Sequence, residues 1–205
     1  MDIQLNFVNK SNDQNNSQIV IFQKNVAAGY NELHVAWQVI QNCGIGDNHP
    51  FTYPQTMQVS ASDSWGNFTP RLDAQPGQQF AVNYTGSGDT LGLNGAATYP
   101  TEVQVVNLLS QGAVSANIYK SGSLLSTKTS VAPQQMASFE FKPTIWIGAA
   151  SQIVQGTVIN SAIVDQINTE LSLLGIASAD IVMTGGGPGQ NSMPFNFTLQ
   201  NVINA

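Results

Sequence analysis

The residues of this chain best suited to catalysis lie in and just before the stretch 42–50. That stretch contains Cys43, Asp47 and His49, and His34 precedes it on a predicted strand. Zinc and iron sites gather three or four such ligands, and a thiol beside an imidazole can act as a nucleophile. However, the sequence contains no His-x-x-x-His or Cys-x-x-Cys pair. We therefore favour an ordinary glycine-rich loop, expect no metal, cofactor or catalytic residue, and keep a metal-assisted enzyme as an alternative.

A second set of residues is suited to binding a sugar. It comprises Tyr53, Asp63, Trp65, Asn67 and Tyr84, which combine aromatic rings with a carboxylate and an amide. Aromatic rings stack on the apolar faces of sugars, and carboxylates and amides hydrogen-bond the hydroxyl groups. An EF-hand calcium loop is excluded here, because Trp65 stands where an oxygen ligand is required. We predict these five as ligand-binding residues, against the alternative that the rings close the ends of a core.

Two further stretches resemble a phosphate-binding loop and a membrane hairpin, but other features of the same stretches argue against both functions. Gly185 to Gly189 follows an apolar run, but Pro188 and the residues after it do not begin the helix that a phosphate loop needs. We therefore predict a flexible loop there. Residues 143–164 carry no charge and partly alternate, as in a pore-forming hairpin or in ordinary sandwich strands. We favour the strands and retain a pore-forming or membrane-damaging protein as an alternative function.

The composition indicates a protein that functions through short-range interactions of a neutral, amide-rich surface. The chain has 20 Asn and 20 Gln among 205 residues, only 9% charged residues, and a net charge of −6. Its six basic residues are scattered, so we exclude nucleic acid as a partner. A neutral surface repels copies of itself weakly, and strands poor in Lys and Arg lack a common barrier to lateral pairing. We predict a non-catalytic protein that acts by self-assembly as a homo-oligomer or by recognising a glycan or cell-surface ligand.

The strand pattern predicts the fold class. Apolar and polar residues alternate over 3–7, 35–39, 57–59, 80–84 and 195–199, and glycine, proline and asparagine separate such runs. We predict an all-β fold, an antiparallel β-sandwich of about a dozen short strands. Asn94-Gly95 and Ser121-Gly122 are expected to form tight turns, the second of them inside a hairpin.

One segment fits two secondary structures. Apolar residues recur at helical spacing within 161–174, and Asn160 or Ser161 can cap a helix there. Thr169 to Leu173 equally alternates as a strand. The sequence therefore leaves one short helix near 161–174 as an open alternative to a strand.

Domain number and location follow from weaker signals. We expect a single β-sandwich domain over 1–205, with two packed sandwiches over 1–99 and 100–205 as the alternative, because no linker or clear repeat separates the halves. Cys43 is the only cysteine, so no disulfide within the chain is expected. No classical signal peptide is recognised, and we expect a cytoplasmic protein or export by another route.

Overall fold

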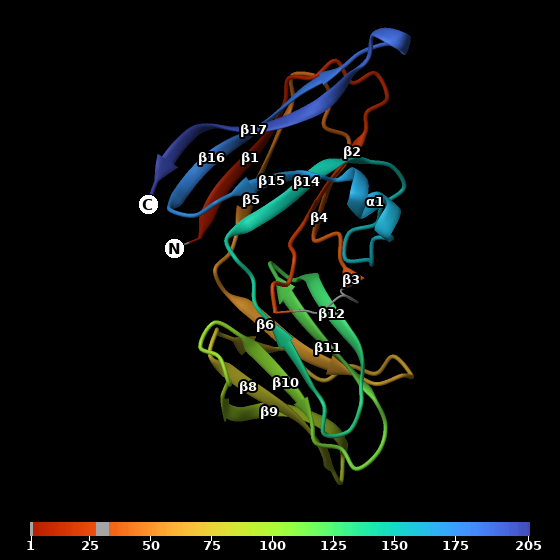
Figure 1. Ribbon diagram of the computed structural model, residues 1–205, viewed down its shortest axis with the longest axis vertical. Helices are drawn as coiled ribbons and strands as arrows, with labels where there is room; N and C mark the ends of the chain where they lie inside the picture. Colours follow the sequence, from red (N-terminus) through yellow and green to blue (C-terminus); the bar gives the residue numbers. More distant parts are fainter. Residues whose placement is uncertain (1, 28–32) are drawn as a thin grey trace. The chain divides into compact units, whose positions relative to one another are not determined.

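The computed structural model describes residues 2–27 and 33–205, and its architecture is all-β as predicted (Figure 1). These residues form seventeen strands in four sheets, with one short α-helix. The expected antiparallel pattern holds for most strand pairs, but β1 (Ile3–Asn9) and β16 (Ile176–Gly186) are parallel, as are β8 (Gln78–Thr85) and β10 (Val103–Asn107). These two parallel pairs are additions to the predicted antiparallel pattern, and each joins strands that are not consecutive in the sequence.

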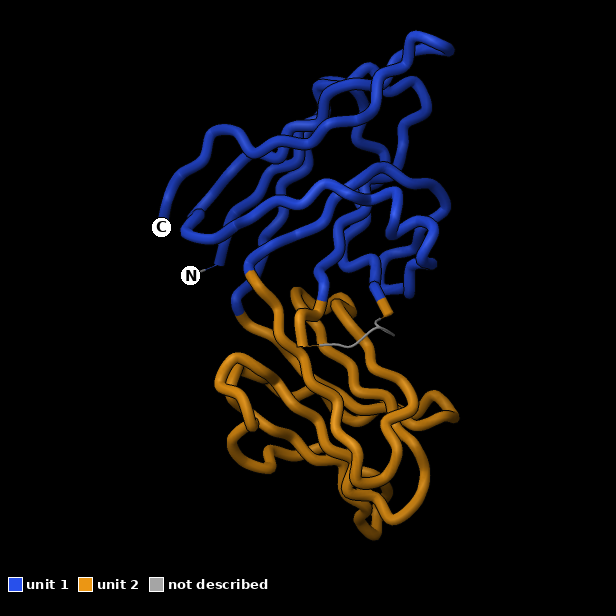
Figure 2. Tube along the Cα trace, in the orientation of Figure 1, with its two compact units in different colours: residues 1–24, 34–55, 143–205 blue, residues 25–33, 56–142 orange. Residues whose placement is uncertain are grey.

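The described chain forms two compact units, each assembled from separated segments (Figure 2). Unit 1 consists of Met1–Lys24, His34–Gln55 and Pro143–Ala205, and unit 2 consists of Asn25–Leu33 and Thr56–Lys142. Their boundaries are not those of the halves 1–99 and 100–205. The assignment of 1–205 to one domain stays a prediction.

Unit 1 contains two four-stranded sheets, in the orders β17-β16-β1-β5 and β15-β14-β2-β4 (Figure 1). Its elements besides β1 and β16 are β2 (Gln18–Phe22), β4 (Gln38–Ile40), β5 (Asn48–Tyr53), β14 (Thr144–Ala150), α1 (Ser161–Gln166), β15 (Thr169–Ser172), the 3₁₀ helix η1 (Gly189–Asn191) and β17 (Met193–Asn204). Alternate residues of β1, namely Ile3, Leu5 and Phe7, are buried, as the period-two pattern predicts. These side chains face the interior of the unit.

An aromatic group joins the two sheets of unit 1. Trp37 directly precedes β4 and is fully buried, and its ring meets that of Tyr53 on β5 edge to face, with centroids 5.8 Å apart. The Gln23 amide, just after β2, donates to the Tyr53 hydroxyl at 3.0 Å. Both contacts connect β5 with segments next to strands of the other sheet, so Tyr53 belongs to the core of this unit.

Unit 2 also contains two sheets, in the orders β13-β10-β8-β9 and β3-β12-β11-β6-β7. Besides β8 and β10, its strands are β3 (Leu33–His34, at the boundary of the unit), β6 (Met57–Ser62), β7 (Leu72–Ala74), β9 (Gly88–Ala96), β11 (Val114–Lys120), β12 (Ser123–Val131) and β13 (Met136–Phe139). Phe80 and Val82 on β8 and Ile118 on β11 are buried. The unit thus has its own hydrophobic core.

One of the two predicted turns is confirmed, and the other is wrong. Lys120 pairs with Ser123, so Ser121 and Gly122 form a two-residue turn with φ of 48° and 75°. Asn94-Gly95 instead lies inside β9, where the pairing with β8 shifts by one residue and Gly95 has φ of 136°. The positive φ of this glycine serves a bulge, and the hairpin turn between β8 and β9 lies at Gly86-Ser87.

The ambiguous segment contains both of the structures that its pattern allowed. Residues 161–166 form α1, whose first turn is capped by the Asn160 side chain accepting from the Ile163 amide at 2.9 Å. Residues 169–172 form β15, which pairs with β14. The apolar residues that follow α1 at helical spacing lie in or beside β15, so the helix is limited to 161–166.

The glycine-rich stretch is not simply a loop. Gly185 and Gly186 extend β16, and Gly185 accepts a hydrogen bond from the Asn12 amide at 2.7 Å. A Cβ on Gly185 would overlap the carbonyl of Pro194, so this close approach of two backbones requires glycine. The predicted flexible loop over 185–189 is therefore wrong for its first two residues.

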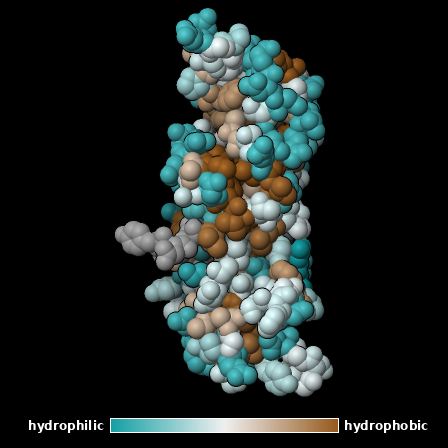
Figure 3. Space-filling model, turned by 90° about the vertical axis from the view of Figure 1, so that its right-hand side faces the viewer, coloured by the Kyte–Doolittle hydropathy of each residue, from teal (hydrophilic) through white to brown (hydrophobic). Residues whose placement is uncertain are grey.

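The uncharged stretch 143–164 contains a strand of the hydrophobic core, β14, and a segment after it with exposed residues. Ile145 and Ile147 of β14 are fully buried, whereas Val154 and Val158 are exposed. Figure 3 shows hydrophobic side chains gathered on the face of unit 1 that carries α1 and the segment before it. Within the described part of the chain, no helix is both long and apolar enough to cross a membrane.

Candidate functional site

The loop 42–50 is held by its own polar groups. The Asp47 carboxylate accepts from the Gly44 amide at 3.2 Å, and Asn9 donates to the carbonyl of Cys43 at 2.8 Å. Burial, and then the nearby Asp47, raise the pKa of the Cys43 thiol, which disfavours the thiolate that a nucleophile needs. Two of the four weak metal candidates, Cys43 and Asp47, therefore lie in a loop whose contacts are structural.

The two histidines do not complete a ligand set with this loop. His49 is exposed on β5, while His34 is half-buried and meets the edge of Phe22 with centroids 5.3 Å apart. Burial, followed by the charge of Lys24, lowers the pKa of His34. Among residues 2–27 and 33–205, no three His, Cys, Asp or Glu side chains are grouped as metal ligands would be.

Four of the five predicted ligand-binding residues lie in unit 2, and Tyr53 does not. Tyr53 is only 2% exposed and is held between Trp37 and Gln23 in unit 1. Its ring is therefore inaccessible to a ligand. Asp63, Trp65, Asn67 and Tyr84 remain as candidates.

The loop after β6 is closed around the Asp63 carboxylate. Its Oδ1 accepts from the amides of Trp65 at 2.8 Å and Asn67 at 2.9 Å, and Oδ2 accepts from the Asn67 side chain at 2.8 Å. Ser62 bridges Phe68 at the base of the loop, and Gly66 adopts φ of 86° at its turn. Short Asp and Asn side chains fold back in this way readily, so the sequence itself specifies the loop.

The hydrogen bonds of this loop favour the ionised form of Asp63, and the loop carries the exposed ring of Trp65. Hydrogen bonds from the Asn67 side chain, and then from its backbone, lower the pKa of Asp63. Trp65, at the tip, is 88% exposed, although Trp is seldom left in water without a partner. The contacts of Asp63 therefore hold the backbone that presents Trp65.

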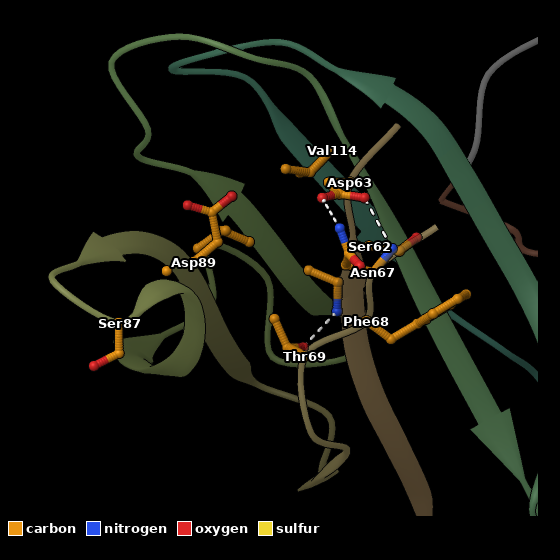
Figure 4. A pocket seen from close by; sticks show the side chains of 11 residues that line it. Ser62, Asp63, Asn67, Phe68, Thr69, Ser87, Asp89 and Val114 are labelled. Carbon is orange, nitrogen blue, oxygen red and sulfur yellow. Dashed lines mark hydrogen bonds between the residues drawn. The ribbon is translucent and has the colours of Figure 1, made fainter. Parts of the chain in front are cut away.

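The hairpin of β8 and β9 brings a second carboxylate to this loop. Tyr84 on β8 pairs directly with Asp89 on β9, and directly paired residues project on the same face of a sheet. Asp89 lies across a cavity from Asp63 and Asn67, while Phe68 points away from Asp89 (Figure 4). The register therefore places Tyr84 next to Asp89, which lines the cavity, although Tyr84 itself does not line it.

Two adjoining cavities flank the carboxylates. One, of about 420 Å³, is lined by Asp63, Asn67, Thr69 and Asp89, and the other, of about 370 Å³, includes Trp65. The two cavities share Asp63, Asp89 and Val114, and neither lining contains Lys or Arg. Trp65, Tyr84 and Phe68 are 88%, 74% and 62% exposed. The arrangement is a groove with hydrogen-bonding walls and aromatic rings near it.

Asp89 is the residue that the sequence pattern did not reveal. It follows Tyr84 by five positions, and the intervening Gly86, Ser87 and Gly88 could have indicated a hairpin that returns it beside the ring. The turn predicted at Asn94-Gly95 lies further along the chain, after Asp89, and gives no reason to bring Asp89 next to Tyr84.

Comparison of the chain with protein-family models, curated proteins and solved structures found no match.

Proposed function

We propose that this chain is a non-catalytic binding protein whose unit 2 recognises a neutral saccharide. The observation that carries the proposal is Trp65, an 88% exposed ring at the tip of a loop braced by Asp63. Trp65 lines a cavity of about 370 Å³ that shares Asp63 and Asp89 with the cavity of about 420 Å³. A loop backbone that is hydrogen-bonded before binding need not be ordered when a sugar stacks on the ring it carries, which lowers the entropy cost of binding. Both cavity volumes fall in the range usual for small-molecule sites.

Hydrogen bonding supplies the polar half of recognition. The Asp89 carboxylate and the Thr69 hydroxyl line the cavity beside the Asn67 amide. Carboxylate oxygens accept from sugar hydroxyls, and amide and hydroxyl groups both donate and accept. A pyranose with one apolar face and a rim of hydroxyls matches this combination.

The acidic side chains that line the cavities favour a neutral sugar over an acidic one. Both ionisable side chains lining the two cavities, Asp63 and Asp89, are acidic, and the chain as a whole carries −6. Uronates, sialylated and sulfated sugars would meet repulsion without a Lys or Arg to offset it. Binding of a neutral oligosaccharide should also depend only weakly on salt.

The decisive variant is Trp65→Ala, assayed first on a glycan array and then by calorimetry on the best neutral oligosaccharide. Truncating a central aromatic anchor typically costs about 2 kcal/mol, or roughly a 30-fold weaker dissociation constant. Because Trp65 is so exposed, the stability of unit 2 should not change.

Tyr99→Ala is the matched control. Tyr99 is 59% exposed and, though also aromatic and in unit 2, lines neither cavity. Its removal should leave affinity unchanged. If no neutral glycan binds, or if Trp65→Ala and Tyr99→Ala weaken binding equally, the proposed site is wrong.

A further inference from the structure

The edge strand β17 of unit 1 is unusual among the edges of this fold. It runs for twelve residues, Met193–Asn204, and contains no Asp, Glu, Lys or Arg. Within the described chain it pairs with β16 on one side and ends its sheet on the other. A long, uncharged edge offers a row of backbone donors and acceptors to another strand.

The other edge strands within the described residues each carry a feature that opposes lateral pairing. Pro50 interrupts β5, and charged side chains lie on β7, β9 and β15, at Asp73, Asp89 and Glu170. The strands β3, β4 and β13 are only two, three and four residues long. Short strands, proline and charge are the usual protections of sheet edges, and β17 lacks all three along most of its length.

The regular part of β17 is the segment Asn196–Gln200. Register shifts interrupt its pairing with β16 on either side of this segment, and Asn201 has φ of 49°. Between the shifts, Asn196 to Gln200 pair without interruption with Thr184 to Asp180. These five residues therefore present a straight edge, while the bulges bend the ends of the strand away.

This segment is complementary to itself in antiparallel register. Centred on Thr198, the pairing sets Thr198 against Thr198 of a second copy and Asn196 against its Gln200 on the outer face. Asn196 and Gln200 are exposed and Thr198 is half-buried, so all three side chains reach the surface. Cross-strand hydroxyl pairs stabilise antiparallel sheets, and facing amides can hydrogen-bond each other.

The inner face of the same register is apolar. Phe197, which is buried, would lie opposite Leu199 of the second copy, and Leu199 is half-buried. An aromatic ring facing an aliphatic side chain is a favourable cross-strand pair. No charge on β17 opposes the approach of an identical strand.

We infer that two copies of this chain associate through β17, in an antiparallel pairing centred on Thr198 that joins two four-stranded sheets into one of eight strands. The isologous symmetry closes the interface at a dimer. This inference concerns unit 1 and does not depend on saccharide binding by unit 2.

Sedimentation equilibrium from micromolar to near-millimolar concentration tests the association, with Thr198→Lys as the disrupting variant. Two lysines facing each other at the symmetry axis should weaken the dimer roughly tenfold or more. Thr90→Lys is the matched control, because Thr90 is also a threonine that reaches the surface on an edge strand, β9, but lies in unit 2. It should leave the dimer intact.

Disulfide cross-linking tests the register, in a Cys43→Ser background that removes the native thiol. Thr198→Cys should form a cross-linked dimer on mild oxidation, because directly opposed residues lie within disulfide range. Gln200→Cys, on the same face, should not, since the two copies of residue 200 would be about 13 Å apart along the strands. A protein that stays monomeric throughout, a dimer unaffected by Thr198→Lys, or preferential cross-linking through residue 200 would each overturn the inference.

Discussion

Tyr53 and Tyr84 should separate stability from binding. Both rings belong to the residue set that the sequence suggested for a sugar site, but Tyr53 is 2% exposed and Tyr84 is 74% exposed. Removing the Tyr53 hydroxyl with Tyr53→Phe deletes the bond from Gln23 and keeps the ring against Trp37. This substitution should destabilise unit 1 and leave saccharide affinity unchanged.

The expected magnitude follows from the burial of this contact. A buried neutral hydrogen bond contributes about 1 kcal/mol, and leaving a buried partner without it costs about 1 to 3 kcal/mol. The Gln23 amide also donates to the Thr144 carbonyl at 2.8 Å, so it keeps one partner in the variant. We therefore expect a loss of about 1 to 1.5 kcal/mol for Tyr53→Phe. Tyr84→Ala should change stability by less than about 0.5 kcal/mol.

Urea unfolding can be followed for unit 1 alone. The chain has three tryptophans, of which Trp37 and Trp146 lie in unit 1 and Trp65 lies in unit 2. In a Trp65→Phe background, tryptophan emission therefore reports unit 1. Since two units need not unfold in one step, this restriction makes the measured free energy well defined.

Saccharide affinity, measured in the native-tryptophan protein, completes the comparison. Tyr84→Ala should weaken binding, because Tyr84 is exposed and pairs directly with Asp89, which lines both cavities. The reasoning fails if Tyr53→Phe leaves the urea midpoint unchanged, or if it weakens binding while Tyr84→Ala does not. The first result would mean that the Gln23 bond does not stabilise unit 1, and the second would place the binding surface in unit 1.

Two further predictions concern pH and membranes. The pKa of Asp63 is lowered in the folded loop, so the stability that Asp63 contributes is present above its unfolded pKa and is lost as pH falls through the folded value. Saccharide binding should therefore hold down to about pH 4 and fall below it, and the fall should be smaller in Asp63→Asn, which keeps only the Asp89 carboxylate. Because Ile145 and Ile147 are committed to the core, we expect no dye release from liposomes; release by the wild type that Val158→Asp abolishes would instead support the membrane hypothesis.

Local pattern predicted the strands better than their pairing. Alternation identified β1 and β17, and a two-residue glycine turn identified the hairpin at Ser121-Gly122. The parallel pairing of β1 with β16 joins residues more than 170 positions apart, for example Gln4 and Ser178. No local propensity encodes such a contact, because it depends on how the layers of a unit close.

The candidate site was predictable only where it is local. Asp63, Trp65 and Asn67 lie within one loop, and the folding of Asp side chains onto nearby amides is a short-range rule. Asp89 joins them through the β8 and β9 hairpin, and Tyr53 leaves them because β5 belongs to the other unit. Chain proximity cannot decide which aromatic rings share a surface.

The abundance of Asn and Gln serves the interior as well as the surface. The buried Asn107 donates to the carbonyls of Gly112 and Val131 and accepts from the Leu109 amide. The buried Asn25 likewise donates to the Ser138 carbonyl and accepts from the Glu140 amide. An amide can satisfy an irregular backbone in both directions without carrying a charge into the core, whereas a carboxylate can only accept.

Composition alone is therefore a weak guide to a contact surface in this chain. Several amides have structural partners, and even Asp63 is occupied in closing its own loop. Trp65 differs because its ring is 88% exposed and the loop would close through Asp63 and Asn67 without it. A large apolar ring left in water by a hydrogen-bonded loop costs solvation without adding to the core, and this is the reason for which we propose Trp65 as the centre of a binding site.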